Sequence, residues 1–457
     1  MNNPQTRIPF FLGIIPIITI FVIMLFQVSI LKIMVPHVAI LCGIIVLCSI
    51  AIYSKYPWQD IENSIYKDIS SGLPAIGILI LIGIMIATWI MSGTVPFIIY
   101  HGLNLISPKY FLISATLICI ITSIVTGTSW GTIGTVGIAL VGIAEANAIP
   151  VPLACGAIIS GAYFGDKMSP LSDTTNLTSS LCRVNLFSHI KNMFPTTIPA
   201  TIIALILYFI IGLNYGQETV SNKDSQIPLI LSTLKSSFNF TYFLLIPPVL
   251  IVILSIKKVP ALLVIFIGIL SAILCAAFFQ GSGITQIIVV IKNGYTASTG
   301  VLPIDTLLSK GGIDSMMSVI ILSILALAFG SLLKNLQITE TILEKMQSLI
   351  QSDRSLRVVS ILTPAFLNVV ICDIYLTIIL TKELYIDEYD KRKVPRLNLS
   401  RSIEEGGTFL NPLVPWASGG IFAMGVFGIS TFEYAQYAFI CWLSPLIGLI
   451  LAFKRSK

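Results

Sequence analysis

The sequence predicts an all-α polytopic membrane protein made of inverted repeats, with two re-entrant hairpins, broken helices and about ten spans. Three observations support this fold class. Of 457 residues, 55% are hydrophobic and only 11% are charged, whereas about 25% are charged in ordinary soluble domains. The mean hydropathy is +0.93, and several apolar runs approach the ~20 residues that a spanning helix needs. Finally, the two halves of the chain match weakly when they are aligned.

Composition also excludes several classes of protein. The net charge of +6 is better explained by cytoplasmic loops that face anionic lipid than by nucleic acid. The eight cysteines are scattered and form no C-x-x-C pair, so we expect small buried side chains and neither disulfides nor a metal site. The sequence has no nucleotide-binding loop, catalytic triad or zinc motif. We therefore expect no enzyme activity and no cofactor.

The chain begins with two apolar runs, 9–31 and 34–53, which predict two leading transmembrane helices within segment 1–71. The first run is too long for a signal-peptide core and has no cleavage site. The next runs include 111–125 and 131–144, which look too short to cross comfortably. Because they flank the polar motif Thr126–Thr132, we expect a re-entrant hairpin with this motif at its tip.

An internal repeat divides the rest of the chain. When the second half is aligned with the first, Gly72 matches Gly312, and each of these glycines opens a long apolar run. A similar shift aligns Gly165 with Gly407. We therefore predict repeat 1 at 72–213, a linker with two transmembrane helices at 214–311, and repeat 2 with the C-terminal tail at 312–457. Basic blocks flank the run 358–381 on both sides, which favours a second re-entrant hairpin there.

Charge predicts the orientation of the repeats. Residues 382–401 carry six basic side chains, whereas the equivalent strip 145–152 carries none. The positive-inside rule places the first strip in the cytoplasm and the second outside. Equivalent loops on opposite sides are what an inverted repeat requires. Both termini are then expected in the cytoplasm, and the linker 214–240 outside.

Hydroxyl groups concentrate at the first predicted tip. Thr126, Thr128, Ser129 and Thr132 lie among glycines, and hydroxyl and carbonyl oxygens suit a hard cation such as Na+. The alternative is close helix packing through small residues such as Gly127 and Gly131.

Carboxylates inside apolar sequence are the next candidates, because an ionisable group at membrane depth is costly. Asp166 and Asp173 flank Pro170, which breaks the helix. Asp373 lies within an apolar run and has no neutralising neighbour in the sequence. The alternative for the first two acids is a solvated interface loop in which Lys167 pairs with Asp166. Glu404 and Glu405 are either functional or neutralise Arg401.

The predicted ligand set for ions or substrate combines these hydroxyls and acids with three amides near the breaks. Its members are Thr126, Thr128, Ser129, Thr132, Asp166, Asp173, Asn176, Asn368, Asp373 and Asn411. Within it, Ser129, Thr132, Asp166 and Asp373 are the predicted Na+ ligands.

The motifs Gly127–Thr135 and Gly165–Asn176 resemble those of the NhaC-type Na+/H+ antiporter family. The stretches 87–96, 311–316, 399–408 and 412–416 also resemble that family, and the likeness runs from about residue 10 to the C-terminus. One departure concerns the second tip, where residues 368–373 replace the Thr, Ser and Gly pattern of the first.

The resemblance implies a bacterial inner-membrane secondary transporter with inverted repeats and two re-entrant hairpins. We expect Na+/H+ antiport by alternating access, with a carboxylate as the shared ligand. The alternative is Na+- or H+-coupled exchange of small organic anions, such as malate and lactate, or of amino acids. An enzyme or a simple channel is a more distant alternative. The expected partners are Na+, H+ and membrane lipid but not nucleic acid, and a homodimer is compatible with the sequence.

Overall fold

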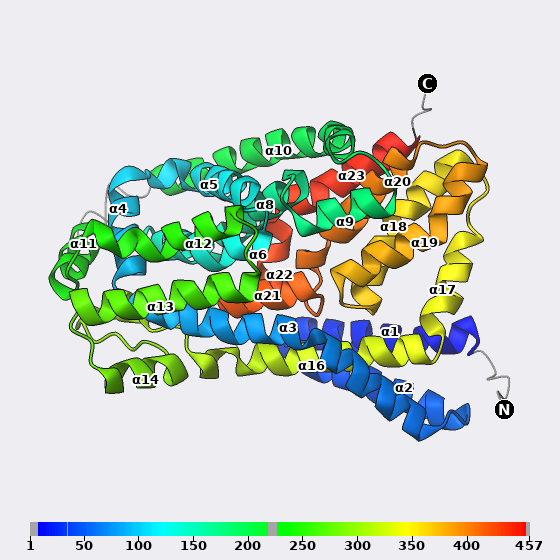
Figure 1. The fold of residues 1–457 in the computed structure, drawn as a ribbon, viewed down its shortest axis with the longest axis horizontal. Helices are drawn as coiled ribbons and strands as arrows, with labels where there is room; N and C mark the ends of the chain where they lie inside the picture. The colour runs from blue at the N-terminus through cyan, green and yellow to red at the C-terminus, as the bar shows by residue number, and fades with distance from the viewer. Residues whose placement is uncertain (1–7, 34, 218–225, 454–457) are drawn as a thin grey trace.

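The computed structural model describes residues 8–33, 35–217 and 226–453, and every regular element within these ranges is a helix (Figure 1). Eight helices are long and apolar enough to cross a membrane, or ten if each of two bent pairs is one span. The chain is thus a multi-pass, all-α membrane protein with broken helices, which confirms the predicted fold class. Both termini, predicted to be cytoplasmic, lie outside the described residues, as does 218–225 of the predicted external linker.

The first three helices are α1 (Phe10–Phe26), α2 (His37–Tyr53) and α3 (Trp58–Met91). Helix α3 has 34 residues, or about 51 Å at 1.5 Å per residue. The boundary predicted between residues 71 and 72 therefore falls inside a continuous helix. Hydropathy missed the start of α3 because its first turns carry the polar and charged residues of 58–71.

Besides most of α3, the segment predicted as repeat 1 includes these α-helices: α4 (Thr94–Leu105), α5 (Phe111–Thr126), α6 (Ser129–Thr132), α7 (Ile138–Ala146), α8 (Val151–Met168), α9 (Asp173–Leu181) and α10 (Leu186–Gln217). The chain reverses between α5 and α6 at Gly127, whose φ of +74° is readily adopted by glycine. The two arms, Pro108–Thr126 and Ser129–Ala146, have 19 and 18 residues. Both arms are longer than the apolar runs 111–125 and 131–144 suggested. Each is long enough to cross a membrane, so the expectation of short arms was wrong.

Helices α5 and α8 pack side by side because small residues let their backbones approach. A Cβ atom on Gly161 would lie 2.3 Å from the Thr116 carbonyl oxygen, and one on Gly165 would lie 2.6 Å from the Ile124 backbone nitrogen. The Ser123 hydroxyl donates to the Ala162 carbonyl at 2.6 Å. Close backbone approach through glycine is typical of helix packing in membranes.

The linker and repeat 2 contain the remaining helices: α11 (Gln226–Ser237), α12 (Ile246–Ile256), α13 (Ala261–Phe279), α14 (Ile284–Asn293), α15 (Leu302–Leu308), α16 (Ile313–Asn335), α17 (Ile338–Gln347), α18 (Asp353–Val370), α19 (Ile374–Lys391), α20 (Arg396–Ile403), α21 (Ser418–Phe427), α22 (Thr431–Tyr434) and α23 (Phe439–Phe453). Helices α18 and α19 form a second hairpin. They lie toward the opposite end of the molecule from α4 and the start of α5 (Figure 1). The residue boundaries of the repeats stay a prediction.

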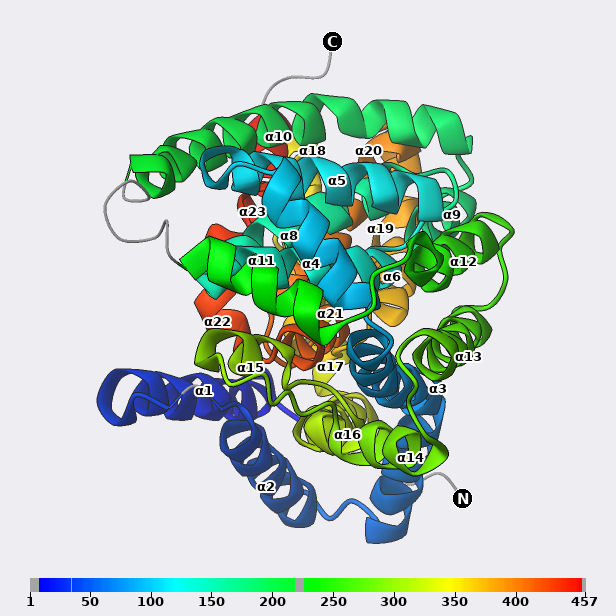
Figure 2. The same ribbon diagram turned by 90° about the vertical axis from the view of Figure 1, so that its left-hand side faces the viewer.

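Helices α3 and α16 are joined at a backbone contact. The Gly312 N–H donates to the Gly83 carbonyl at 2.7 Å, and a Cβ on Gly83 would lie 2.5 Å from the Gly312 carbonyl oxygen. Seen from the end of the molecule, α1, α2 and α16 lie on the side opposite α10 (Figure 2). The two hairpins lie between these layers.

Candidate functional site

The tips of the two hairpins meet next to α21. The Trp130 ring stacks on Phe422 of α21 with the ring centroids 4.4 Å apart. The Ser418 N–H, at the start of α21, donates to the Cys372 carbonyl of the second tip at 3.1 Å. A cavity of about 60 Å³ lies here, lined by Trp130 and Asp373 among others and by residues 72–79 of α3. This position is midway along α3, so the tips meet deep inside the bundle.

Asp166 lies where α8 ends and receives two hydroxyl hydrogen bonds. Ser129 of the first tip donates to Asp166 Oδ2 at 2.6 Å, and Ser172, after the helix break, donates to Asp166 Oδ1 at 2.7 Å. Ser129 and Ser172 are buried, whereas Asp166 is partly exposed. The structure therefore brings a predicted acid and a predicted hydroxyl together at a position that small ions can reach.

The other hydroxyls of the first tip bond within their own helical segments. Thr128 accepts the Gly131 N–H at 3.2 Å and so caps α6. Thr132 donates to the Thr128 carbonyl at 2.9 Å, and Thr126 donates to the Thr122 carbonyl at 2.9 Å. These three side chains shape the tip, and none of them shares a hydrogen bond with Asp166 among those that the described residues form.

The break between α8 and α9 is held by Asn176. Its Nδ2 donates to the Pro170 carbonyl at 2.8 Å and to the Ser172 carbonyl at 2.7 Å, which fixes the turn that presents Ser172. Asp173 is exposed in the first turn of α9, where its negative charge interacts favourably with the helix dipole.

The second tip is organised by Asp373 and two asparagines. Asp373 Oδ1 accepts the Leu376 N–H at 2.7 Å and so caps α19. Asn368 Nδ2 donates to the Gly406 and Gly407 carbonyls at 3.2 Å and 2.7 Å. Asn411 Nδ2 donates to Asn368 Oδ1 at 3.0 Å. This amide network ties the tip to the second broken helix.

Of the predicted Na+ ligands, Ser129 and Asp166 are in direct contact, whereas Thr132 bonds to its own helix and Asp373 caps another.

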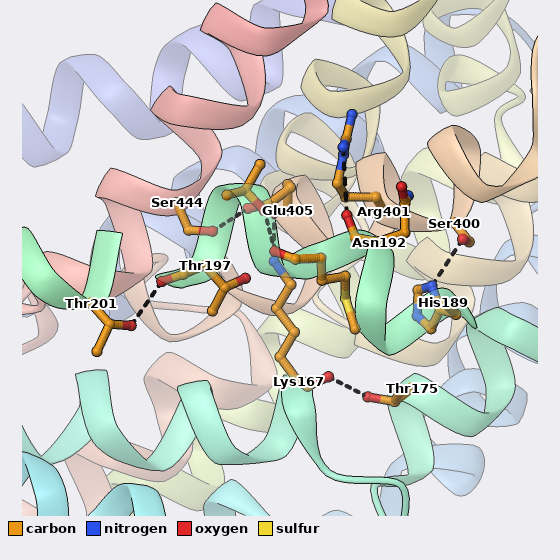
Figure 3. Close-up of polar contacts among 12 residues, drawn as sticks. Lys167, Thr175, His189, Asn192, Thr197, Thr201, Ser400, Arg401, Glu405 and Ser444 are labelled. Carbon is orange, nitrogen blue, oxygen red and sulfur yellow. Dashed lines mark hydrogen bonds and ion pairs between the residues drawn. The ribbon is translucent and has the colours of Figure 1, made fainter. Parts of the chain in front are cut away.

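Sequence reasoning missed the main ion pair of the site. Lys167 Nζ lies 2.6 Å from Glu405 Oε1, and both side chains are fully buried. Figure 3 shows Lys167 extending from α8 toward Glu405, beside residues of α10. Glu405 also accepts hydrogen bonds from Thr196 at 2.5 Å and from Ser444 at 2.7 Å. The Lys167 ammonium lies 4.2 Å from the centroid of the Phe409 ring, a favourable cation–π distance.

This pair corrects two of the sequence alternatives. Lys167 pairs with Glu405 and not with Asp166, and Glu405 is neutralised by Lys167, while Arg401 Nη1 donates to the Asn192 carbonyl at 3.5 Å. Consecutive residues of a helix point about 100° apart, so Asp166 and Lys167 face different neighbours. That geometry was the signal available in the sequence.

No group of three or more His, Cys, Asp or Glu side chains is placed to hold a metal ion within residues 8–33, 35–217 and 226–453. The carboxylate and hydroxyl oxygens at Asp166 are hard ligands, the kind that hard cations prefer.

Comparisons with known proteins identify the family. The family model described as the Na+/H+ antiporter family matches residues 161–454. The chain is 36% identical over 449 residues to the malate-2H+/Na+-lactate antiporter of Bacillus subtilis, covering 98% of this chain and 95% of that protein. It is 37% identical to the Na+/H+ antiporter NhaC of Alkalihalophilus pseudofirmus, covering 92% and 90%. It is 35% identical to the arginine/ornithine antiporter ArcD of Halobacterium salinarum, covering 88% and 83%. The chain belongs to the Na+/H+ antiporter family.

Proposed function

We propose that the chain exchanges Na+ for H+ by alternating access in the bacterial inner membrane, with both termini in the cytoplasm. The observation that carries this proposal is the Asp166 carboxylate, which two broken-helix hydroxyls contact within the bundle. A carboxylate binds either a proton or Na+, and hydroxyl oxygens complete the shell of the metal ion. The ion gradient drives the exchange, so no cofactor and no catalytic group is required.

Alternating access requires the same site to open to each side in turn. The site lies between two hairpins that enter from opposite ends of the molecule (Figure 1). Such an arrangement supports rocking of the hairpins about a central site. A homodimer stays a prediction from the sequence.

A second candidate is the exchange of organic anions or amino acids, which the names of two relatives favour. A carboxylate substrate would need a donor inside the site. Lys167 is a buried cation near the hairpin tips, and Glu405 already neutralises it. This pairing favours inorganic ion exchange.

The test is transport by purified protein in proteoliposomes with an internal pH-sensitive dye. We expect a Na+ pulse alone to move protons, and Asp166→Asn to abolish that movement. Asp387→Asn, an exposed site on α19, is the matched control and should transport normally. Proton movement only when malate, lactate or arginine is supplied would favour the second candidate. Normal exchange by Asp166→Asn would remove this residue from the site.

A further inference from the structure

Glu404 is a buried acid that the exchange described above does not use. It starts a π-helical turn, Glu404–Thr408, that continues α20. Its exposure is 0%, and within the described part of the chain neither carboxylate oxygen has a hydrogen-bond partner. Two hydroxyls, those of Thr178 on α9 and Thr408, lie close to this carboxyl. Both hydroxyls are buried, and neither has a hydrogen bond to any group other than this carboxyl among the described residues.

Such a group of unpartnered oxygens is unusual. Most buried polar atoms in native proteins are hydrogen-bonded, and leaving one unsatisfied costs about 1–3 kcal/mol, or more for a charged group. Two acids nearby are fully satisfied. Asp166 accepts two hydroxyl hydrogen bonds, and Glu405 has Lys167, Thr196 and Ser444. The lack of hydrogen bonds is therefore specific to Glu404 and is not shared by the neighbouring acids.

Glu404 has no direct counter-ion within the described residues. Lys167 pairs with Glu405 at 2.6 Å, and none of the ion pairs in the described part of the chain includes Glu404. The titratable groups that Glu404 senses are Lys167 and Asp166 of α8 and, at the end of α9, Cys182. None of them donates a hydrogen bond to it within the described residues.

We propose that the Glu404 carboxylate, with the hydroxyls of Thr178 and Thr408, forms a second site for a small monovalent cation, Na+ or H+, separate from Asp166. One carboxylate and two hydroxyls supply hard oxygen ligands. π-Helical turns often mark functional positions within helices. The site rests on the proposed exchange and extends it, since two loaded carboxyls let one cycle carry more than one cation.

The experiment measures two quantities on the full-length protein. The first is the number of Na+ ions bound per chain at saturation in detergent, measured with radioactive sodium. The second is the number of H+ moved per Na+ in proteoliposomes, obtained from the pH gradient that balances an imposed Na+ gradient. If Glu404 holds Na+, wild type binds two Na+ and Glu404→Gln binds one. If it holds H+, both bind one Na+, and the coupling ratio falls by one proton in Glu404→Gln. Unchanged values of both quantities in Glu404→Gln overturn the proposal.

Control variants separate the causes. Glu383→Gln, an exposed site on α19, should match wild type in both quantities. Thr178→Val with Thr408→Val removes only hydroxyls, so it weakens Na+ binding if the site takes Na+ and leaves the proton ratio intact if it takes H+. If Glu404→Gln fails to fold in a thermal melt, Glu404→Met replaces it, because it removes the acid without burying an amide, and wild-type values for it also overturn the proposal. Because binding is read without transport, a failure of Asp166 as the exchange site leaves this result interpretable.

Discussion

Lys167 and Glu405 form a fully buried ion pair, with Nζ and Oε1 2.6 Å apart. The pair joins the broken helix of the first predicted repeat to that of the second. Each partner has a further stabilising contact, the Phe409 ring for Lys167 and the Ser444 hydroxyl for Glu405. The two halves of the chain are therefore connected by charge at the depth where ions are proposed to bind.

Breaking this pair should destabilise the protein more than replacing it. Lys167→Met leaves the Glu405 carboxylate buried without a counter-ion, and Glu405→Gln leaves the Lys167 ammonium so. Either loss should lower the free energy of unfolding by about 3–5 kcal/mol. The double variant Lys167→Met/Glu405→Met removes both charges and should recover part of that loss. Thermal melting in detergent measures the three variants, and additive losses would show that the two side chains do not interact.

Competition between Na+ and H+ predicts how transport depends on pH. If both ions use one carboxylate, a proton must leave before Na+ binds. The apparent KM for Na+ should then rise as pH falls, by up to about tenfold per pH unit where the acid is mostly protonated. The maximal rate at saturating Na+ should change much less. A KM independent of pH would show that the two ions do not share a ligand.

The two glycines of the first tip should differ in their tolerance of alanine. Gly127 has φ of +74°, and its Cβ would lie 2.7 Å from the Leu171 backbone carbon. Gly131 has a helical conformation, and its Cβ would meet the Thr128 methyl group at 2.5 Å, a contact that one side chain can relieve. Left-handed backbone alone costs alanine about 1–2 kcal/mol. Gly127→Ala should therefore lower transport and melting temperature more than Gly131→Ala, and equal effects would contradict this account.

The inverted repeat predicts that the two hairpin bases face opposite sides of the membrane. Single cysteines at Ala148 and Asp390, in a background without the eight native cysteines, test this orientation. Both positions are exposed, whereas the neighbouring Asn147 is buried. An impermeant maleimide should label Ala148→Cys from outside intact cells and Asp390→Cys only after lysis. Labelling of both from the same side would refute the inverted arrangement.

Much of the fold was predictable from the sequence because the membrane limits the possible structures. The apolar runs predicted the spans, and Pro170 and Gly127 marked the positions of breaks. The contact of Ser129 with Asp166 lies between two motifs that both stood out as polar stretches in apolar sequence.

The pairing of Lys167 could not be predicted in the same way. Its partner comes from the other half of the chain, and hydropathy carries no information on contacts between distant helices. Adjacency made Asp166 look like the partner of Lys167, and Arg401 look like the partner of Glu405. Three-dimensional packing, with α8, α10 and the turn after α20 side by side, decides between these pairings.

The backbone contact between Gly83 and Gly312 has a mechanical consequence. A main-chain hydrogen bond of 2.7 Å between them, with no side chain between the two segments, holds this point of α3 against the start of α16. The long helices can tilt about that point, but sliding past one another would break the bond inside the protein. Displacements of α3 relative to α16 during the transport cycle are therefore expected to be smallest at this contact and to increase with distance from it along α3.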